Sequence, residues 1–435
     1  MTLSRRFILS STIGWSAASY ARILCANDRV GVGVVGFSDR AKDALLPAFA
    51  KLAPELNFEF RAVSDIWSRR REEGVAFAGK LNGKPVDGVR NNDELYQRKD
   101  IDAVIISTAD FQHALHGVEA VRAGRDAYIE KPLANRMEDA RAILRAVEET
   151  KRVVQIGTQR RSTESAIKVR EYLKSGQFGD INMVELAWHV NQPSRWRRAE
   201  LVRTLRKEDT DWDRFLLNRP KVTWDPRKYL EFRLFWPYSS GIPDQWMVHQ
   251  IDLVHWFTGL RHPRSVAASG SIYQWHDGRT NPDTVTAVLD YGPLDNPAKG
   301  FQVLFSARMG NASGRENELF FSNRGTLDLT TTHISADGGL TKGEAEKVGT
   351  QPNIAVETTL VPNAFRPTSA ANTGVDVSVL AHMRNWMECI RSRRKPVAGV
   401  RAGYDHSVAL CMTIAALRSG RRVTFNDAKQ EVVMA

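Results

Sequence analysis

Cysteine is scarce in this 435-residue sequence, which has only Cys25, Cys389 and Cys411. The three lie far apart, and no two have the spacing of a metal-binding pair, so neither a disulfide framework nor a cysteine metal site is expected. The hydrophobic share of 42% and the charged share of 26% are those of a soluble globular protein. The length predicts two domains.

Acidic residues are missing from the start of the chain, where none precedes Asp28. Residues 4–9, Ser-Arg-Arg-Phe-Ile-Leu, place two arginines before an apolar stretch that reaches about Ala18. This order predicts a twin-arginine signal peptide over residues 1–26 and export to the periplasm. A basic N-terminal helix is the alternative. The apolar stretch is too short for an ordinary membrane span, so no stable span is expected after export.

The formal net charge is +11, and it falls to +8 if Arg5, Arg6 and Arg22 leave with a signal peptide. The remaining excess is spread over short clusters of arginine and lysine. No nucleic-acid-binding module accompanies these clusters, so nucleic acid is not an expected partner. An acidic or polyhydroxylated substrate fits the charge better.

Apolar β-type runs alternate with helical stretches from residue 29 to 155. Strands are expected at 30–36, 58–64, 101–107, 126–130 and 153–156. Such alternation predicts an α/β fold that begins with a Rossmann domain, a parallel sheet whose two faces are covered by helices.

The turn after the first strand carries half of a dinucleotide-binding fingerprint. Gly33 and Gly36 are present, but Ser38 replaces the next glycine, and Asp39 adds negative charge where phosphate is expected. Asp65 follows the second strand and is well placed for a ribose hydroxyl, which favours NAD over NADP. Arginines at 69–71 weaken that preference.

Residues 126–133, Asp-Ala-Tyr-Ile-Glu-Lys-Pro-Leu, end a strand with a glutamate, a lysine and a proline. Because Pro132 cannot donate to a sheet ladder, the strand ends there and Lys131 projects from its carboxyl end. Ligands bind at that edge of a doubly wound sheet. The alternative is a solvated salt bridge between Glu130 and Lys131.

Three segments, 107–113, 123–133 and 155–161, resemble the Gfo/Idh/MocA oxidoreductases, in particular their exported members. The resemblance implies that Lys131 lies between the nicotinamide and the reacting carbon of the substrate. With the turn residues, it implies a cofactor site made by Gly33, Gly36, Ser38, Arg40, Asp65, Thr108, His113, Glu130, Lys131 and Gln159.

The remainder, 156–435, is predicted to be a substrate-binding and oligomerisation domain of α+β type. Strands are expected in five stretches between 265 and 330, and they suggest an open, mainly antiparallel sheet. Such a sheet commonly pairs subunits in the family, so a homo-oligomer is expected. Aromatic and cationic residues crowd 191–237, a composition that suits sugar rings, although these aromatics can equally pack an irregular loop. Residues 335–375 are expected to be irregular.

A helix is expected from about Asp244, and it brings His249 and Asp252 onto one face. The resemblance makes His249 the second acid/base group, and Asp252 is expected to orient it. Many relatives have an aspartate four residues before this histidine, where this chain has Gln245, which cannot take a proton. A metal site from His249, Asp252, His113 or His189 is a weaker alternative.

The resemblance implies an exported NAD-dependent oxidoreductase that takes hydride from a carbinol carbon of a carbohydrate or polyol. Outside the cytoplasm NAD must be tightly bound and recycled. Two alternatives stay open: a redox-neutral or metal-assisted glycoside lyase or hydrolase, and a non-catalytic carbohydrate-binding relative. The expected substrate residues are Arg161, Asn191, Trp236, Gln245 and His249, and the expected catalytic residues are Lys131, His249 and Asp252.

Overall fold

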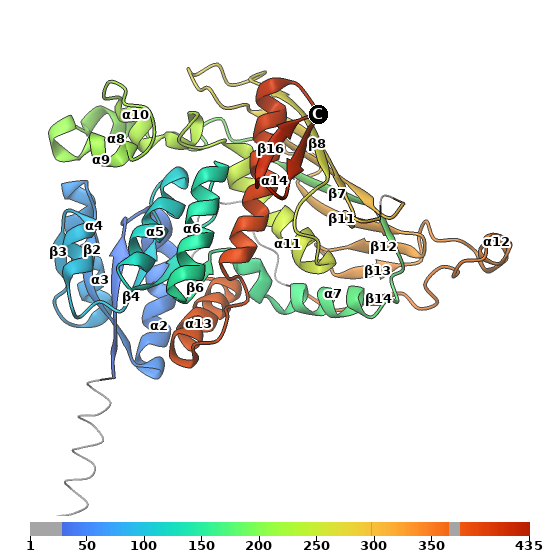
Figure 1. Ribbon diagram of the computed structural model, residues 1–435, viewed down its shortest axis with the longest axis horizontal. Helices are drawn as coiled ribbons and strands as arrows, with labels where there is room; N and C mark the ends of the chain where they lie inside the picture. The colour runs from blue at the N-terminus through green and yellow to red at the C-terminus, as the bar shows by residue number, and fades with distance from the viewer. Residues whose placement is uncertain (1–27, 297, 365–374) are drawn as a thin grey trace, which may run out of the picture.

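The computed structural model describes residues 28–296, 298–364 and 375–435. The predicted signal peptide at 1–26 lies outside these residues. The chain is organised around two β-sheets, one in each half of Figure 1. Across the described ranges, none of the helices has both the length and the apolar composition needed to cross a membrane.

The first sheet is parallel and has the strand order β3-β2-β1-β4-β5-β6. Strands β1 and β4 are apolar along their whole length, and β5 is apolar after Asp126, because helices cover both faces. The order reverses between β1 and β4, which is the position where Rossmann folds bind dinucleotides. The strands are β1 (Val30–Val35), β2 (Phe58–Ser64), β3 (Asp87–Val89), β4 (Ala103–Ile106), β5 (Asp126–Ile129) and β6 (Val154–Ile156).

Helices connect these strands, as the sequence predicts. They are α2 (Leu46–Leu56), α3 (Ser68–Asn82), α4 (Asn92–Gln97), α5 (His113–Arg122) and α6 (Met137–Thr150). A π-helical turn, Ala41–Leu45, leads from the glycine turn into α2. The Rossmann prediction is therefore confirmed, and each of the five expected strands is present, while the edge strand β3 was not predicted.

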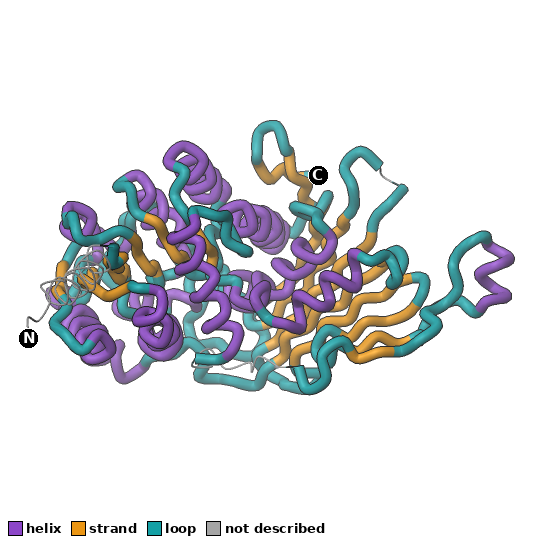
Figure 2. Tube along the Cα trace, turned by 90° about the horizontal axis from the view of Figure 1, so that it is seen from below, coloured by secondary structure: helices purple, strands orange, loops and turns teal. Residues whose placement is uncertain are grey.

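The second sheet has ten strands in the order β14-β13-β12-β11-β7-β10-β9-β8-β15-β16. Only β7 and β10 run parallel, and every other neighbouring pair is antiparallel, which confirms the predicted open, mainly antiparallel sheet. Figure 2 shows these strands side by side in the half of the molecule away from the Rossmann domain. The strands are β7 (Ile181–His189), β8 (Ser265–Ser271), β9 (Thr284–Tyr291), β10 (Phe301–Arg308), β11 (Glu316–Ser322), β12 (Gly325–Asp328), β13 (His333–Ser335), β14 (Thr358–Thr359), β15 (Val423–Asn426) and β16 (Glu431–Met434).

The second half of the chain also carries helices, among them one in the stretch expected to be irregular. That helix is α12, which begins with a capping box between Thr341 and Glu344, a local signal that the irregular prediction overlooked. The helices are α7 (Glu164–Lys174), α8 (Ala199–Thr204), α9 (Trp212–Leu216), α10 (Pro226–Leu230), α11 (Val248–Thr258), α12 (Lys342–Val348), α13 (Val377–Ser392) and α14 (Val400–Ser419).

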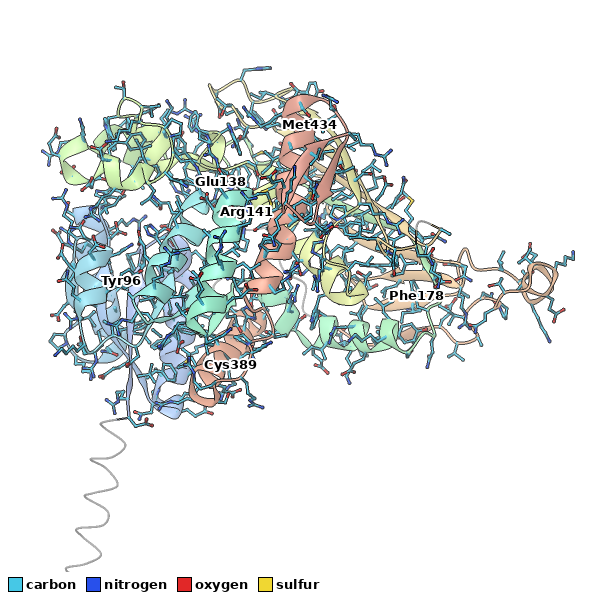
Figure 3. All side chains as sticks on the ribbon, viewed as in Figure 1. Tyr96, Glu138, Arg141, Phe178, Cys389 and Met434 are labelled. Carbon is cyan, nitrogen blue, oxygen red and sulfur yellow. The ribbon has the colours of Figure 1, made fainter. Side chains whose placement is uncertain are left out.

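Helix α13 packs against the Rossmann sheet although it lies near the end of the chain. Trp386 and Met383 are fully buried in one apolar cluster with residues of β1, β2 and β5, and Tyr128 meets the Trp386 ring edge-on with the centroids 5.8 Å apart. Figure 3 labels Cys389 on this helix. The predicted boundary at residue 155 falls inside β6, and α13 shows that the core of the first domain also includes residues from the end of the chain.

A second contact joins the Rossmann domain to the end of the chain. Figure 3 labels Arg141 on α6 and Met434 on β16. The Arg141 guanidinium donates to the Gln430 carbonyl at 3.1 Å and lies 3.5 Å from the Glu431 carboxylate. The C-terminal hairpin thus contacts both domains.

Residues 191–240, between β7 and the segment that leads into α11, form a lid segment over the carboxyl ends of the Rossmann strands. Figure 1 shows its helices α8, α9 and α10 in light green beside the Rossmann helices. Charged side chains fasten it to the first domain through the pairs Arg198–Asp39, Arg214–Asp93, Asp211–Arg90 and Arg219–Asp139. The Arg219–Asp139 pair is buried, so this part of the lid segment packs tightly against α6.

The position of α13 leads to a stability prediction. Trp386→Ala should destabilise the protein by about 3 to 5 kcal/mol, because it leaves a large cavity against the Rossmann sheet. Val377→Ala is the matched control on the same helix, since that side chain is 63% exposed. Thermal unfolding followed by calorimetry measures both. Equal unfolding temperatures for the two variants would contradict the packing described here.

Candidate active site

A cavity lies between the carboxyl ends of the Rossmann strands and the lid segment. It is lined by every residue of the predicted cofactor site except Gly33. Gly33 lies inside β1, where an added Cβ would come within 3.0 Å of the Leu95 side chain. The role of Gly33 is therefore close packing within the domain, and its prediction as a cofactor contact is corrected.

The glycine turn has the geometry of a phosphate-binding turn at Gly36. This residue has a φ of +82°, and a Cβ there would lie 2.6 Å from Cγ2 of Thr108. Only glycine fits without movement of the neighbouring strand end. Ser38 replaces the next glycine, and its hydroxyl accepts the N–H of Ala41 at 3.2 Å, which leaves the hydroxyl proton free to donate to a phosphate.

Asp39 was expected to repel phosphate, but two arginines neutralise it. Arg70 from α3 lies 2.8 Å from one carboxylate oxygen, and Arg198 from the lid segment lies 3.0 Å from the other. The turn therefore presents no unbalanced negative charge. Sequence alone could not show this, because Arg198 is far away along the chain.

Asp65 closes the turn from the end of β2. Its two oxygens accept the N–H groups of Phe37 at 2.8 Å and Trp67 at 2.9 Å, while burial raises the pKa of its carboxyl. Each oxygen keeps a further lone pair for a hydroxyl donor. The three arginines after it are engaged: Arg69 and Arg70 with Glu73, and Arg71 with the Asp65 carbonyl.

Buried polar atoms without partners mark the cavity as a binding site. Arg40 Nη2, Thr108 Oγ1 and Gln159 Oε1 are buried, and none has a hydrogen-bond partner among the described residues. Native proteins rarely leave such groups unsatisfied. Because the three come from separate segments around one cavity, the residues present fit a bound dinucleotide.

Lys131 lies in the same cavity, and its Nζ donates to the Gln245 carbonyl at 3.2 Å. Desolvation lowers the pKa of its ammonium to about 8, against the opposing charges of Asp110 and Glu130. The Glu130 carboxylate pairs with Arg40 at 2.9 Å and not with Lys131. A solvated Glu130–Lys131 salt bridge, the alternative at this position, is thus contradicted.

His113 supports this segment from α5. Its Nδ1 lies 2.8 Å from the Pro132 carbonyl oxygen, next to the cis peptide bond between Lys131 and Pro132. Burial lowers the pKa of the imidazole, so the ring is neutral near pH 7. His113 lines the cavity and also positions the lysine.

His249 reaches the cavity from the first turn of α11. Its ring stacks on Trp188 with the centroids 6.2 Å apart. Desolvation and the charges of Lys131, Arg160 and Arg40 hold the pKa of His249 well below its usual value. The imidazole is therefore neutral at pH 7 and can exchange a proton only as a neutral donor or acceptor.

Asp252 does not contact His249, which corrects the predicted orienting role. Arg161 binds both Asp252 oxygens at 2.7 and 2.9 Å, and His406 Nδ1 lies 3.4 Å from the carboxylate. These partners hold the pKa of Asp252 well below its usual value despite its burial. No hydrogen bond joins Asp252 to His249 in the part of the chain that the structure describes.

The same pairing removes Arg161 from the predicted substrate residues. Its neighbour Arg160 lines the cavity instead and binds Glu318 on β11. Two adjacent residues in a short 3-10 helix point to different sides, a difference that a motif match cannot predict.

Asn191 and Trp236 also lie outside the cavity lining, contrary to prediction. Asn191 is exposed and forms a backbone bridge with Gly310. The Trp236 ring lies under the Arg418 guanidinium, 4.8 Å from it. Of the predicted substrate residues, Gln245 and His249 remain in the cavity.

Asp110 is a cavity residue that the sequence analysis missed. Gln245 Nε2 donates to Asp110 Oδ2 at 2.5 Å, and Ser239 Oγ donates to the same oxygen at 2.6 Å. Gln245 Oε1 accepts from Arg233 Nε at 2.9 Å. Many relatives have an aspartate where this chain has Gln245. Here the carboxylate of Asp110, from the turn after β4, is hydrogen-bonded to Gln245. The signal was present, since Asp110 lies in the motif 107–113.

The neighbouring Asp244 is fully buried and lies outside the cavity. It accepts the Ser240 N–H at 2.7 Å, and burial beside Asp110 raises the pKa of its carboxyl to about 7. Its role is to hold the turn before α11. Among the residues described, no three His, Cys, Asp or Glu side chains converge to hold a metal ion, so the metal alternative has no support there.

Comparison with known proteins identifies the class. Residues 30–158 match the model of the "Oxidoreductase family, NAD-binding Rossmann fold", GFO_IDH_MocA. An inositol 2-dehydrogenase of Rhizobium meliloti is 32% identical over 141 residues, which are 31% of this chain and 42% of that protein. A 1,5-anhydro-D-fructose reductase of Ensifer adhaerens is 29% identical over 66% of this chain and 80% of its own length. The first domain of the chain, residues 30–158, thus matches the NAD-binding domain of the Gfo/Idh/MocA oxidoreductase family.

Solved structures share the fold over both domains. The WlbA dehydrogenase of Bordetella pertussis, solved with NADH and UDP-GlcNAcA, has a TM-score of 0.63 at 17% identity and covers 92% of this chain and 99% of its own. An aldose-aldose oxidoreductase of Caulobacter crescentus, solved with glycerol, has a TM-score of 0.60 at 18% identity. The match covers 91% of this chain and 100% of that one. At such identities the likeness establishes the fold alone.

The glycine turn yields a prediction with a matched control. Gly36→Ala should release the dinucleotide, because the new Cβ meets Thr108 at the phosphate-binding turn. Gly83→Ala has the same type of backbone strain, with a φ of +70°, but no atom lies within 4 Å of its Cβ. Gly83→Ala should lose about 1 kcal/mol of stability, and Gly36→Ala should lose more because the clash with Thr108 adds to the strain. Only Gly36→Ala should lose NAD when the released nucleotide is quantified, and equal NAD contents would contradict the assignment.

Proposed function

We propose that the protein is an exported NAD-dependent oxidoreductase that acts on a carbinol carbon of a carbohydrate or polyol. The observation that carries the proposal is Lys131, an amine with a pKa of about 8 in the cavity that also contains the glycine turn. A base with that pKa is roughly one-fifth neutral at about pH 7.4 and half neutral at about pH 8, so it can take a hydroxyl proton. The relatives named as inositol dehydrogenase and anhydrofructose reductase support the substrate class.

The chain's own residues bind and position the reactants. Gly36, Ser38 and Asp65 would hold the phosphates and ribose of NAD, which supplies the hydride acceptor when bound. Neutral Lys131 takes the proton of the substrate hydroxyl as the carbinol loses its hydride and becomes a carbonyl. His249, neutral and beside Trp188, hydrogen-bonds the same or the adjacent hydroxyl.

Asp65 and the three arginines that follow it in sequence favour binding of NAD over binding of NADP. The carboxylate stands where a 2′-phosphate would be repelled, and Arg69, Arg70 and Arg71 already have partners in α3, in the glycine turn and at Asp65. An NADP site needs a free cation at this position.

The lid segment supports tight retention of the cofactor. Its ion pairs to Asp39 and Asp93 join it to the Rossmann domain, and all four paired residues line the cavity. Retention fits export, since the twin-arginine start in residues 4–9 is typical of proteins that cross the membrane folded. We place the protein in the periplasm as a homo-oligomer that pairs through the ten-stranded sheet.

A cofactor analysis tests the proposal directly. The mature protein, purified without added nucleotide and then denatured, should release about one NAD per chain, as judged by mass spectrometry. Incubation with a panel of sugars and polyols should give a ketone product two hydrogens lighter. An elimination product would instead support the lyase alternative, and the absence of both NAD and product would support a binding protein.

Substitution of Lys131 tests the catalytic assignment. Lys131→Met should lower turnover about 10²- to 10⁴-fold, because the base is lost while the side-chain volume is kept. NAD content and unfolding temperature should stay unchanged, which separates a chemical from a structural effect. Normal turnover in this variant would rule out Lys131 as the base.

The pH profile gives an independent check. Turnover should rise through about pH 8 as Lys131 loses its proton. Asp110 raises the pKa of Lys131, so Asp110→Asn should move this rising limb to lower pH. Gln250→Ala, a buried change on α11 away from the cavity, serves as the control that leaves the limb in place. A limb that does not move in Asp110→Asn would mean that another group sets the profile.

A further inference from the structure

Two residues of the lid segment adopt a backbone conformation that their side chains disfavour. Trp196 has a φ of +65° and Leu217 has a φ of +48°, a region in which glycine is the usual residue. Among the non-glycine residues with positive φ in the described ranges, these two are the ones that line the cavity. Backbone strain of this kind gathers at active sites and ligand clamps, so the lid segment has a role there beyond covering the cavity.

Neighbouring contacts hold Trp196 in its strained conformation. The Arg197 N–H donates to the Ser194 carbonyl at 3.0 Å and closes a turn around Trp196. The carboxylate of Glu231, which is 1% exposed, accepts the Arg198 N–H at 2.7 Å and Arg197 Nε at 3.0 Å. The residues that follow Trp196 are therefore fixed, and they keep its backbone from relaxing.

The Trp196 ring begins a row of aromatic rings that ends at His249. Its centroid lies 5.5 Å from that of Trp246, in the π-helical turn Pro243–Met247 before α11. Trp246 stacks on Trp188 with the planes 3° apart and the centroids 6.0 Å apart, and Trp188 stacks on His249 at 6.2 Å. These separations are those of favourable aromatic pairs. All four residues line the cavity.

His249 is oriented by ring contact and not by a hydrogen bond. In the part of the chain that the structure describes, its imidazole has no hydrogen-bond partner, and Asp252 is bound by Arg161 instead. A functional histidine commonly has one ring nitrogen fixed by a carboxylate or a backbone carbonyl. Stacking on Trp188 takes the place of that bond here, and it restricts the ring plane while leaving both nitrogens available to a substrate.

The turn that carries Trp196 also contacts the cofactor side of the cavity. Two residues after Trp196, the Arg198 guanidinium lies 3.0 Å from the Asp39 carboxylate in the glycine turn. One residue before it, the Arg195 guanidinium carbon lies 5.3 Å from the centroid of the Trp246 ring. Displacement of this turn would therefore free the Trp246 ring and the glycine turn together.

We propose that Trp196 is a positioning residue, which fixes the orientation of His249 through Trp246 and Trp188 when the lid segment is in place. The inference rests on the proposed function, in which His249 hydrogen-bonds a substrate hydroxyl. It explains a tryptophan at a position whose backbone favours glycine, since the strained turn sets the indole against Trp246. Trp196 acts through the other rings and need not touch the substrate.

Nuclear magnetic resonance of isotope-labelled histidine tests this without a substrate. The protein is used as purified, and the ring signal of His249 is identified by its absence from His249→Gln. Because indole rings shift the signal of a stacked imidazole, Trp196→Gly should move the His249 signal toward that of free histidine. Glycine accepts the positive φ, so this change removes the ring without adding strain. Trp196→Phe keeps a ring there and should give a smaller shift.

Trp224→Ala is the matched control. This tryptophan also belongs to the lid segment, but it packs edge-on against Trp212, with the centroids 5.2 Å apart, and is not among the residues that line the cavity. The variant should leave the His249 signal in place.

Kinetics give a second readout on any sugar or polyol of the panel that yields a ketone. Trp196→Gly should lower kcat about 10- to 100-fold, as expected when a catalytic group is misplaced by about 1 Å. KM and the NAD content should change little, because the rings orient His249 and do not hold the cofactor. Trp196→Phe should recover part of kcat, and Trp224→Ala should keep it.

Other results would overturn the inference. An unchanged His249 signal in Trp196→Gly would do so, whatever happens to turnover, as would an equal shift in Trp224→Ala. Loss of NAD from Trp196→Gly with an unmoved signal would assign Trp196 to the cofactor. A shifted signal in a protein that oxidises no member of the panel would keep the positioning of His249 and reject the proposed oxidoreductase.

Discussion

Desolvation of Lys131 is the physical constraint on which the site depends. An ammonium group at the end of β5 is deprived of water, and its closest acceptor is a neutral carbonyl from the segment before α11. Its pKa near 8 therefore depends on two domains at once, through Asp110 and Glu130 on one side and Arg233 on the other. Neutral His113 and His249 complete an environment that makes proton transfer from a hydroxyl feasible at ordinary pH.

Charge balance in the molecule depends on contacts between segments far apart in sequence. Asp39 in the glycine turn is paired with Arg198 of the lid segment as well as with Arg70, and Gln245 is hydrogen-bonded to the carboxylate of Asp110. Both departures from the family pattern are thus compensated in the fold. They do not argue for loss of function.

The sequence predicted the Rossmann sheet and the large antiparallel sheet because local hydrophobic periodicity determines both. The residues predicted for the cofactor, except Gly33, line the cavity, because each belongs to a turn or strand end that can be recognised in the sequence. Of the predicted substrate residues, only Gln245 and His249 line the cavity. Arg161, Asn191, Trp236 and Asp252 were chosen from motifs or composition, whereas Arg160, Asp110 and Arg195 reach the cavity through side-chain directions and a lid that only the three-dimensional packing determines. Arg160 and Arg161 are both largely buried and differ in side-chain direction, with Arg160 bound to Glu318 and Arg161 to Asp252.

The packing of α13 has a consequence for biosynthesis. Val379, Met383, Trp386 and Ile390 cover a face of the Rossmann sheet, yet they are made only after nearly the whole chain has been translated. The first domain therefore cannot complete its core on the ribosome ahead of the second, as tandem domains commonly do. A nascent chain that stops before residue 377 would lack α13 and expose that apolar face, so completion of the first domain is delayed until synthesis is almost finished.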